Sequence, residues 1–329
     1  MNTTLQSDSI WNDESLGGRD YYERRDASGA VRPQWSMVSE HINALGNDSM
    51  RDRSRAIEQF IRENGVTFHV DTGTGESNRP WNLSAIPFVL GGQEWDVLAA
   101  GLAERTRLLE RVLNDLLGEQ RLIREGIVPG EVLWANPSFN RSYHGLADTL
   151  QKLHVTATDL ARGTDGVWRV LGDRTRAPSG LGYLLENRVV ISRVMPSLIR
   201  STNTHRLASF FESLKEHLRS IAPTAKDNPR VALLTPPSGS YREFEDNYLA
   251  RYLGLSLTQG SDLAVRGGEL FLKTLGGLKP IQVLWRHVSD RKCDPLELEP
   301  TSTEGVTGLM RCIRGNRVAV TNMIGSVLA

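Results

Sequence analysis

The sequence feature that most constrains this fold is a hairpin signal within residues 154–193. An Asp-Gly pair at 165–166 separates two β-prone runs, the first ending at Asp159 and the second covering 168–171. Asp-Gly between such runs is a strong local signal for a turn that joins antiparallel strands. The hairpin would carry Asp159 and Asp173 on neighbouring strands. Carboxylates beside an arginine-rich and glycine-containing loop suit a metal ion and an anionic ligand.

Ordinary turn chemistry explains the same residues without any ligand site. Asp-Gly turns are common, charged loops are usually just solvated, and Pro178-Ser179-Gly180 is typical of surface turns. From residue spacing alone, a ligand site and a plain surface turn both stay open.

Longer segments of the chain bear a family resemblance. Residues 173–180 (DRTRAPSG) and 182–188 (GYLLENR) closely resemble the circularly permuted type 2 ATP-grasp family, whose members include relatives of glutathionylspermidine synthase. Further matching segments follow the family order: Arg79-Pro80-Trp81, 118–130, Ala135-Asn136-Pro137, 286–295 and 315–325. The resemblance extends from about residue 57 to 329, so it is far more specific than one short motif.

The resemblance implies a fold and an activity. The expected fold is mixed α/β and ATP-grasp-like, with a helical N-terminal region and a pre-ATP-grasp-like α/β unit. The implied activity is that of an ATP-dependent carboxylate–amine ligase acting through an acyl phosphate, with ATP and Mg²⁺ as cofactors. Small-molecule or peptide carboxylates and amines would be the substrates. Such chemistry needs cations to neutralise the phosphate charge as it develops.

The resemblance also assigns roles to individual residues. It implies metal binding by Asp159, catalytic anion binding by Arg176, and cofactor binding by Ser179, Gly180, Asn187, Arg188 and Arg286. Beside these matching positions, we expect Asp173 to be a second metal-side acid and Arg174 a second catalytic anion binder. Two alternatives stay open. The segment 186–188 suits a helix-surface ion pair equally well, and Arg286 suits a buried structural network with nearby aspartates. Glu245 also matches a family glutamate, although a helical glutamate is usually solvated.

The chain departs from the family pattern beside the hairpin. Where the pattern has a Glu-Asp-Asn triplet that supplies metal ligands, this chain has Gly172-Asp173-Arg174. Either Arg174 takes the place of the metal, or Asp173 turns to serve as a ligand. The lysine-bearing strands that grip ATP in the family follow the segment resembling 315–329. We therefore expect the amino-terminal part of a larger protein, completed by a C-terminal half or a partner protein.

A different class of function is the alternative to the ligase. The missing triplet residues also suit a non-catalytic scaffold that keeps an ATP-grasp-like fold and binds a peptide or a protein. Retention of Asp159 and of the whole 178–188 motif favours the ligase instead. The sequence leaves both functions open.

Composition excludes several other classes. The 39 basic and 39 acidic residues balance to a formal net charge of zero, so nothing suggests nucleic acid or a membrane surface as a partner. The chain has no long apolar run and no leader pattern, and the expected location is the cytoplasm. Two cysteines and seven scattered histidines form neither a disulfide framework nor a transition-metal pattern.

Hydrophobic periodicity and turn signals predict the remaining organisation. We expect a polar tail at 1–34, a helical region with the hairpin and its motif at 35–229, and an α/β unit at 230–329. Predicted helices cover 36–64, 93–118, 181–200, 205–220 and 242–253. The run 231–235 followed by a loop, a helix and the β-prone segment 255–263 predicts a parallel unit, and 269–274 is expected to pair with 281–287. The loop at 178–182 would offer free helix N–H groups to an anion.

Overall fold

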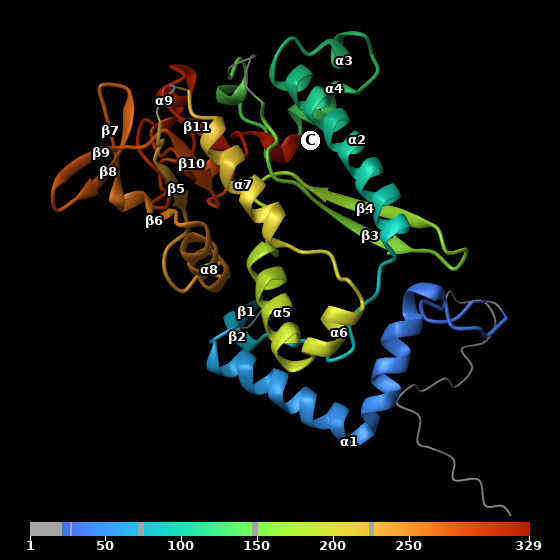
Figure 1. Cartoon of the computed structure of the whole chain (residues 1–329). Coiled ribbons are helices and arrows are strands. Elements are labelled where there is room, and N and C mark those ends of the chain that lie inside the picture. The colour runs from blue at the N-terminus through green and yellow to red at the C-terminus, as the bar shows by residue number, and fades with distance from the viewer. Residues whose placement is uncertain (1–21, 27, 72–75, 147–150, 224–226) are drawn as a thin grey trace, which may run out of the picture. The chain divides into compact units, whose positions relative to one another are not determined.

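The computed structural model describes residues 22–26, 28–71, 76–146, 151–223 and 227–329, and these form two compact units (Figure 1). The first unit comprises the described residues up to Ala99 together with Leu160–Leu171 and Tyr183–Arg206. The second comprises Ala100–Asp159, Gly172–Gly182 and Leu207–Ala329. Most of the predicted polar tail lies outside the described residues. The predicted division at about residue 230 stays a prediction.

The helices follow the predicted order closely. They are α1 (Pro33–Glu63), α2 (Gly92–Leu117), α3 (Arg121–Arg124), α4 (Gly130–Trp134), α5 (Leu181–Val194), α6 (Pro196–Ser201), α7 (Ala208–Ser220), α8 (Glu243–Leu253) and α9 (Leu309–Arg314). The prediction of a single helix at 181–200 is wrong, because the chain forms two helices there, α5 and α6, with α6 beginning at Pro196. A proline has no backbone N–H to continue the helical hydrogen bonds. None of the described helices combines the length and the apolar character that a membrane crossing requires.

The predicted hairpin is confirmed. Strands β3 (Ala157–Arg162) and β4 (Trp168–Arg174) form a two-stranded sheet. The Gly163 N–H donates to the Val167 carbonyl at 2.9 Å and closes the turn. The prediction that the first strand ends at Asp159 is wrong, because β3 continues to the turn. Asp159 therefore lies within the strand.

A parallel sheet forms the centre of the second unit. Its strands are β5 (Val231–Leu234), β6 (Ser256–Thr258), β10 (Val283–Arg286) and β11 (Ala319–Thr321). They lie in the order β11-β10-β5-β6 and all pair in parallel. The prediction of a parallel strand–helix–strand unit is confirmed, since α8 connects β5 to β6. The strand order reverses between β5 and β10, which is where open α/β sheets place polar sites.

One predicted strand pairing is wrong. Strand β8 (Glu269–Thr274) pairs with β7 (Leu263–Arg266) and β9 (Gly277–Pro280), and not with β10 as we expected. A glycine turn at 276–277 reverses the chain earlier than we expected. All four residues of β10 are buried, which suits an inner strand of a parallel sheet covered on both faces. Strands β1 (Thr67–Asp71) and β2 (Glu76–Pro80) form a separate antiparallel pair.

Candidate functional site

The base of the hairpin pairs each candidate metal ligand with an arginine. Arg174 donates from Nε and Nη2 to Asp159 Oδ2 at 3.0 and 2.8 Å. The two side chains are 61% and 50% exposed, so this ion pair is solvated. Asp159 and Arg174 are therefore brought together, and the guanidinium group faces the carboxylate expected to hold a metal.

Asp173 is paired in the same way by a residue of α2. Arg105 donates from Nε and Nη2 to Asp173 Oδ2 at 2.8 and 2.7 Å. The Thr158 hydroxyl donates to the other carboxylate oxygen at 2.9 Å. The hydrogen bond from Arg105 lowers the pKa of Asp173 below its ordinary value, and Asp173 in turn raises the pKa of Arg105. The sequence did not point to Arg105, because 68 residues separate it from its partner.

These contacts do not fit a bound magnesium ion. Mg²⁺ requires a near-octahedral shell of oxygen ligands. Three carboxylate oxygens of Asp159 and Asp173 accept hydrogen bonds from protein donors instead. Within the residues that the structure describes, no three His, Cys, Asp or Glu side chains gather closely enough to hold a metal. The geometry favours the alternative in which Arg174 takes the place of the metal.

The loop after β4 was predicted to offer backbone N–H groups to an external anion. In the structure the Gly180 and Gly182 N–H groups donate to Glu245 Oε1, at 2.6 and 3.1 Å. Glu245 lies on α8 and is 1% exposed, so its interpretation as a solvated helical residue is wrong. An internal carboxylate thus occupies the donors at the start of α5. Arg176 and Ser179 are exposed on the same loop.

The predicted cofactor residues Asn187 and Arg188 make internal contacts within the first unit. Asn187 Oδ1 accepts from Trp81 Nε1 at 2.8 Å, and Arg188 Nη1 donates to the His205 carbonyl at 2.8 Å. Burial lowers the pKa of Arg188. These contacts are hydrogen bonds, and within the described residues the segment 186–188 does not form the helix-surface ion pair of the alternative.

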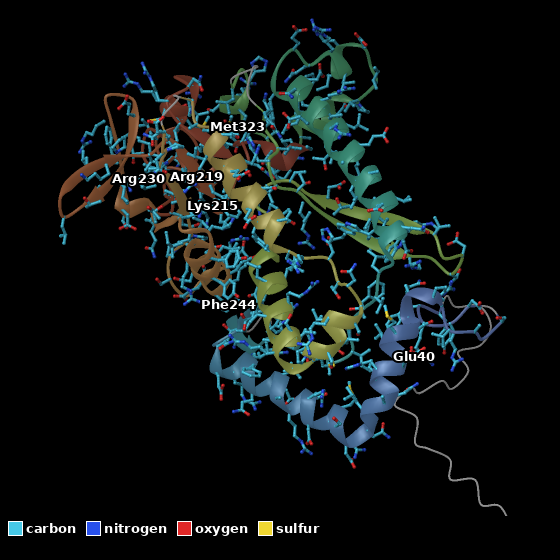
Figure 2. All side chains as sticks on the ribbon, in the orientation of Figure 1. Glu40, Lys215, Arg219, Arg230, Phe244 and Met323 are labelled. Carbon is cyan, nitrogen blue, oxygen red and sulfur yellow. The ribbon has the colours of Figure 1, made fainter. Side chains whose placement is uncertain are left out.

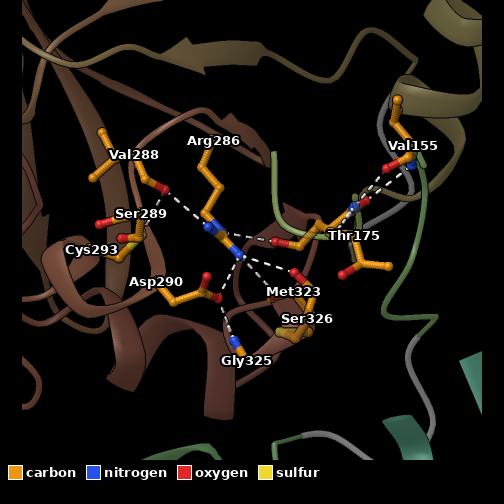
Figure 3. A network of polar contacts seen from close by, with 11 residues as sticks. Val155, Thr175, Arg286, Val288, Ser289, Asp290, Cys293, Met323, Gly325 and Ser326 are labelled. Carbon is orange, nitrogen blue, oxygen red and sulfur yellow. Dashed lines mark hydrogen bonds and ion pairs between the residues drawn. The ribbon is translucent and has the colours of Figure 1, made fainter. Parts of the chain in front are cut away.

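Arg286 lies at the centre of a buried network (Figure 3). Its side chain is 0% exposed, and Nη2 donates to Asp290 Oδ1 at 2.8 Å. The remaining donors contact the carbonyls of Asn322, Val288 and Met323 at 2.9 Å each. Asp290 Oδ1 also accepts from the Gly325 N–H at 2.6 Å. The network favours the structural alternative for Arg286 over contact with a cofactor.

Asn322 attaches the base of the hairpin to the end of β11. Its Nδ2 group donates to the Val155 and Thr175 carbonyls at 2.7 and 2.6 Å, and its Oδ1 accepts from the His154 and Val155 N–H groups at 2.7 and 3.0 Å. Figure 3 shows Val155 and Thr175 at this junction. The sequence interpretation missed Asn322, because nothing local distinguishes it from other asparagines.

A second buried network lies where the order of the parallel strands reverses. Asp246 accepts from the Thr235 hydroxyl at 2.6 Å, from Arg242 Nε at 3.2 Å and contacts His287 Nδ1 at 2.6 Å. Arg242 also pairs with Glu245 at 3.6 Å and donates to the Ala177 carbonyl at 3.3 Å. Burial lowers the pKa of His287. The network therefore ties the loop after β4 to the edge of the parallel sheet.

A pair of histidines joins the segment that leads into β3 to helix α7. His154 Nδ1 and His217 Nε2 are 2.9 Å apart. His217 belongs to α7, between Lys215 and Arg219, which are labelled in Figure 2. Burial, followed by the neighbouring His217, lowers the pKa of His154 to about 4. The His154 imidazole is therefore neutral near pH 7 and shares a hydrogen bond with the His217 ring.

The fold and these contacts define an α/β protein with a hairpin attached to the edge of a parallel sheet. The model of the family "Circularly permuted ATP-grasp type 2" matches residues 87–329. The chain belongs to this family, as the resemblance of its motifs predicted. The match covers the hairpin, the loop after it and both buried networks.

Similar proteins occur in mycobacteria and in a cyanobacterium. The uncharacterized protein Rv2567 of Mycobacterium tuberculosis (strain ATCC 25618 / H37Rv) is 34% identical over 318 residues, which cover 94% of this chain and 36% of the relative. ML0605 of Mycobacterium leprae is 30% identical over 96% of this chain and 56% of the relative. The protein sll0335 of Synechocystis is 33% identical over 95% of this chain and 65% of the relative. The chain thus spans between about a third and two thirds of the length of these relatives.

Proposed function

We propose that the protein is part of an ATP-dependent carboxylate–amine ligase. Such an enzyme activates a carboxylate as an acyl phosphate and lets an amine displace the phosphate. Family membership over residues 87–329 is the observation that carries the proposal. The substrates would be a small-molecule or peptide carboxylate and an amine. Arg176 and Ser179 are exposed on the loop after β4, so both are available to a substrate oxyanion.

The hairpin supports a second proposal, a scaffold without catalysis. Its two candidate metal ligands are each paired with a guanidinium group, Asp159 with Arg174 and Asp173 with Arg105. A scaffold of this kind would keep the family fold and bind a peptide or protein partner. The two proposals differ in whether the chain binds ATP with a divalent metal.

Calorimetric titration with ATP, with and without Mg²⁺, separates the two proposals. Binding that strengthens with Mg²⁺ and is lost in Asp159→Asn supports the ligase. Asp48→Asn is the matched control, because Asp48 is an exposed aspartate that pairs with Arg51 on α1, outside the family match. Absence of ATP binding in both titrations would leave either a scaffold or a ligase that needs the predicted C-terminal half to bind ATP.

The variant Arg174→Asn sharpens the test. It removes the cation from Asp159 and places an amide where the family pattern has one. For a ligase, we expect Arg174→Asn to strengthen Mg²⁺-dependent ATP binding, because a carboxylate and an amide oxygen become available. Weaker or unchanged binding would count against the hairpin as the metal side of the site.

A further inference from the structure

A cavity lies along helix α2, and none of its lining residues is among the predicted site residues. It has a volume of about 460 Å³ and is lined by Gly101, Glu104, Arg105, Arg107, Leu108 and Arg111. All of these residues belong to the second unit. Three guanidinium groups face one carboxylate, so the cavity carries an excess of positive charge.

Two of these guanidinium groups have no partner within the described part of the chain. Neither Arg107 nor Arg111 forms an ion pair or a side-chain hydrogen bond with another described residue. They are four residues apart on one helix, where side chains are neighbours and like charges repel. An anion bound between them would remove this repulsion.

Besides Glu104, two acids of α2 are close in sequence to these arginines, and both make hydrogen bonds to backbone N–H groups and none to Arg107 or Arg111. Glu110 accepts hydrogen bonds from the backbone N–H groups of residues 152 and 153, at 2.8 and 2.7 Å. Asp115 accepts from the backbone N–H groups of residues 121 and 122, at 2.9 and 3.0 Å. Both carboxylates thus hold neighbouring segments of the backbone in place.

Arg105 connects the cavity to the hairpin. Its guanidinium group lines the cavity and donates to Asp173 Oδ2 at 2.7 Å from Nη2. Asp173 therefore balances the charge of Arg105, and Glu104 is the one carboxylate of the cavity that faces Arg107 and Arg111, so a net positive charge remains there. The positively charged lining of the cavity thus begins at Arg105, beside Asp173 of the hairpin, and continues along α2.

We propose that the α2 cavity binds a small, multiply charged oxyanion directly through guanidinium groups, without a divalent metal ion. Guanidinium groups present parallel N–H donors that match two oxygens of a phosphate or a carboxylate. Arg107 and Arg111, one helical turn apart, would engage separate charged groups of the same ligand. The proposal does not depend on the ligase function, since it concerns binding alone.

Calorimetric titration with tripolyphosphate and with citrate, in EDTA and at about 0.05 M salt, tests the proposal because low salt limits screening. We expect the wild-type chain to bind at least one of them. The double variant Arg107→Gln/Arg111→Gln should bind at least about tenfold more weakly, because charge-assisted hydrogen bonds are lost. The affinity of Arg107→Lys/Arg111→Lys should lie between those of the wild type and the glutamine variant, since lysine keeps the charge but lacks the parallel N–H donors of a guanidinium group.

Arg121→Gln is the matched control, because Arg121 is an exposed arginine that pairs with Glu119 and does not line the cavity. Its binding should equal that of the wild type. A stronger response to tripolyphosphate identifies phosphoryl ligands, and a stronger response to citrate identifies carboxylates. Equal binding by the wild type and the double glutamine variant would overturn the proposal. Silence of the wild type with both anions, or binding only after Mg²⁺ is added, would overturn it too. None of these titrations contains ATP, so their outcome is separate from the test of the ligase.

Discussion

The Arg174–Asp159 pair of the hairpin and the Arg286–Asp290 pair of the buried network have the same shortest N–O distance, 2.8 Å. Their surroundings differ completely. The hairpin side chains are 61% and 50% exposed, whereas those of the network are 0% and 3% exposed. Water can replace either partner of the first pair, but a carboxylate lost from the second leaves a buried charge unbalanced. Burial, and not distance, separates an exchangeable contact from a fixed one.

The same contrast explains which predicted site residues are available to a ligand. Asp159 and Arg174 can exchange their mutual contact for ligand contacts at small cost, because solvated ion pairs contribute little. Arg176 is available because its side chain is exposed. Arg286 is not available, since its donors are satisfied by carbonyls and by Asp290. Family resemblance alone assigned both kinds of residue to one site.

The largest expected effect comes from breaking the buried pair. Asp290→Ala should lower the free energy of unfolding by about 3–5 kcal/mol, because it leaves Arg286 charged and buried without its carboxylate. Chemical denaturation followed by circular dichroism measures the change. A loss below about 1 kcal/mol, the range of exposed pairs, would mean that the buried Arg286–Asp290 pair is no more stabilising than the exposed Arg174–Asp159 pair.

The half-buried histidine pair should give an intermediate effect that depends on pH. The folded-state pKa of His154 is about 4, below the ordinary value of about 6.5, so the folded state binds fewer protons than the unfolded state. Its contribution to stability is therefore complete above about pH 6.5 and declines as the pH falls toward 4, by roughly 2–3 kcal/mol in total. Denaturation between about pH 6.5 and 5 measures this slope above the titration of most carboxylates.

Two variants test whether the change of stability with pH arises from the His154–His217 pair. His154→Gln should make stability fall less steeply with decreasing pH. His205→Gln, at an exposed histidine, should leave the slope as in the wild type. Equal slopes in His154→Gln and the wild type would assign the pH dependence to other groups.

A matched pair of glycine substitutions tests packing in the two settings. A Cβ atom on Gly182 would lie 2.9 Å from Glu245 Cγ and 3.3 Å from Glu245 Cα, whereas one on Gly172 would meet nothing within 4 Å. We expect Gly182→Ala to cost about 1–2 kcal/mol and Gly172→Ala much less. Thermal unfolding of both variants gives the comparison. Equal melting temperatures would mean that the Glu245 contact with the loop is loose.

The smallest expected effect is at the exposed pair itself. Asp159→Ala should change the free energy of unfolding by less than about 1 kcal/mol, and the difference should shrink further at high salt. Denaturation at low and high ionic strength provides the measurement. A loss as large as that of Asp290→Ala would show that the hairpin pair is structural.

Local signals predicted the hairpin and most helices, because an Asp-Gly turn and a helical period depend on neighbouring residues. The pairing of 269–274 with 281–287 failed for the same reason. Proximity in the sequence favours a hairpin, but the fully buried β10 gains more as an inner strand between β5 and β11.

The sequence named candidate site residues, but it did not predict their contacts. Motifs identified Asp159, Asp173 and the loop after β4, yet their partners Arg105 and Glu245 are 68 and 65 residues away from them. No local pattern determines such pairs. Only the folded chain places an arginine of α2 beside Asp173 and a buried glutamate beside Gly180.

The contacts of Asn322 determine when, during synthesis, the base of the hairpin can be fixed. It holds Val155 and Thr175, which precede it by 167 and 147 residues. At typical synthesis rates of about 5–20 residues per second, roughly 7 to 33 seconds pass on the ribosome between these segments and Asn322. During that interval the nascent hairpin has its own turn but lacks the clamp at its base. The segment that most clearly marks the family is thus secured at its base only after Asn322 has been made.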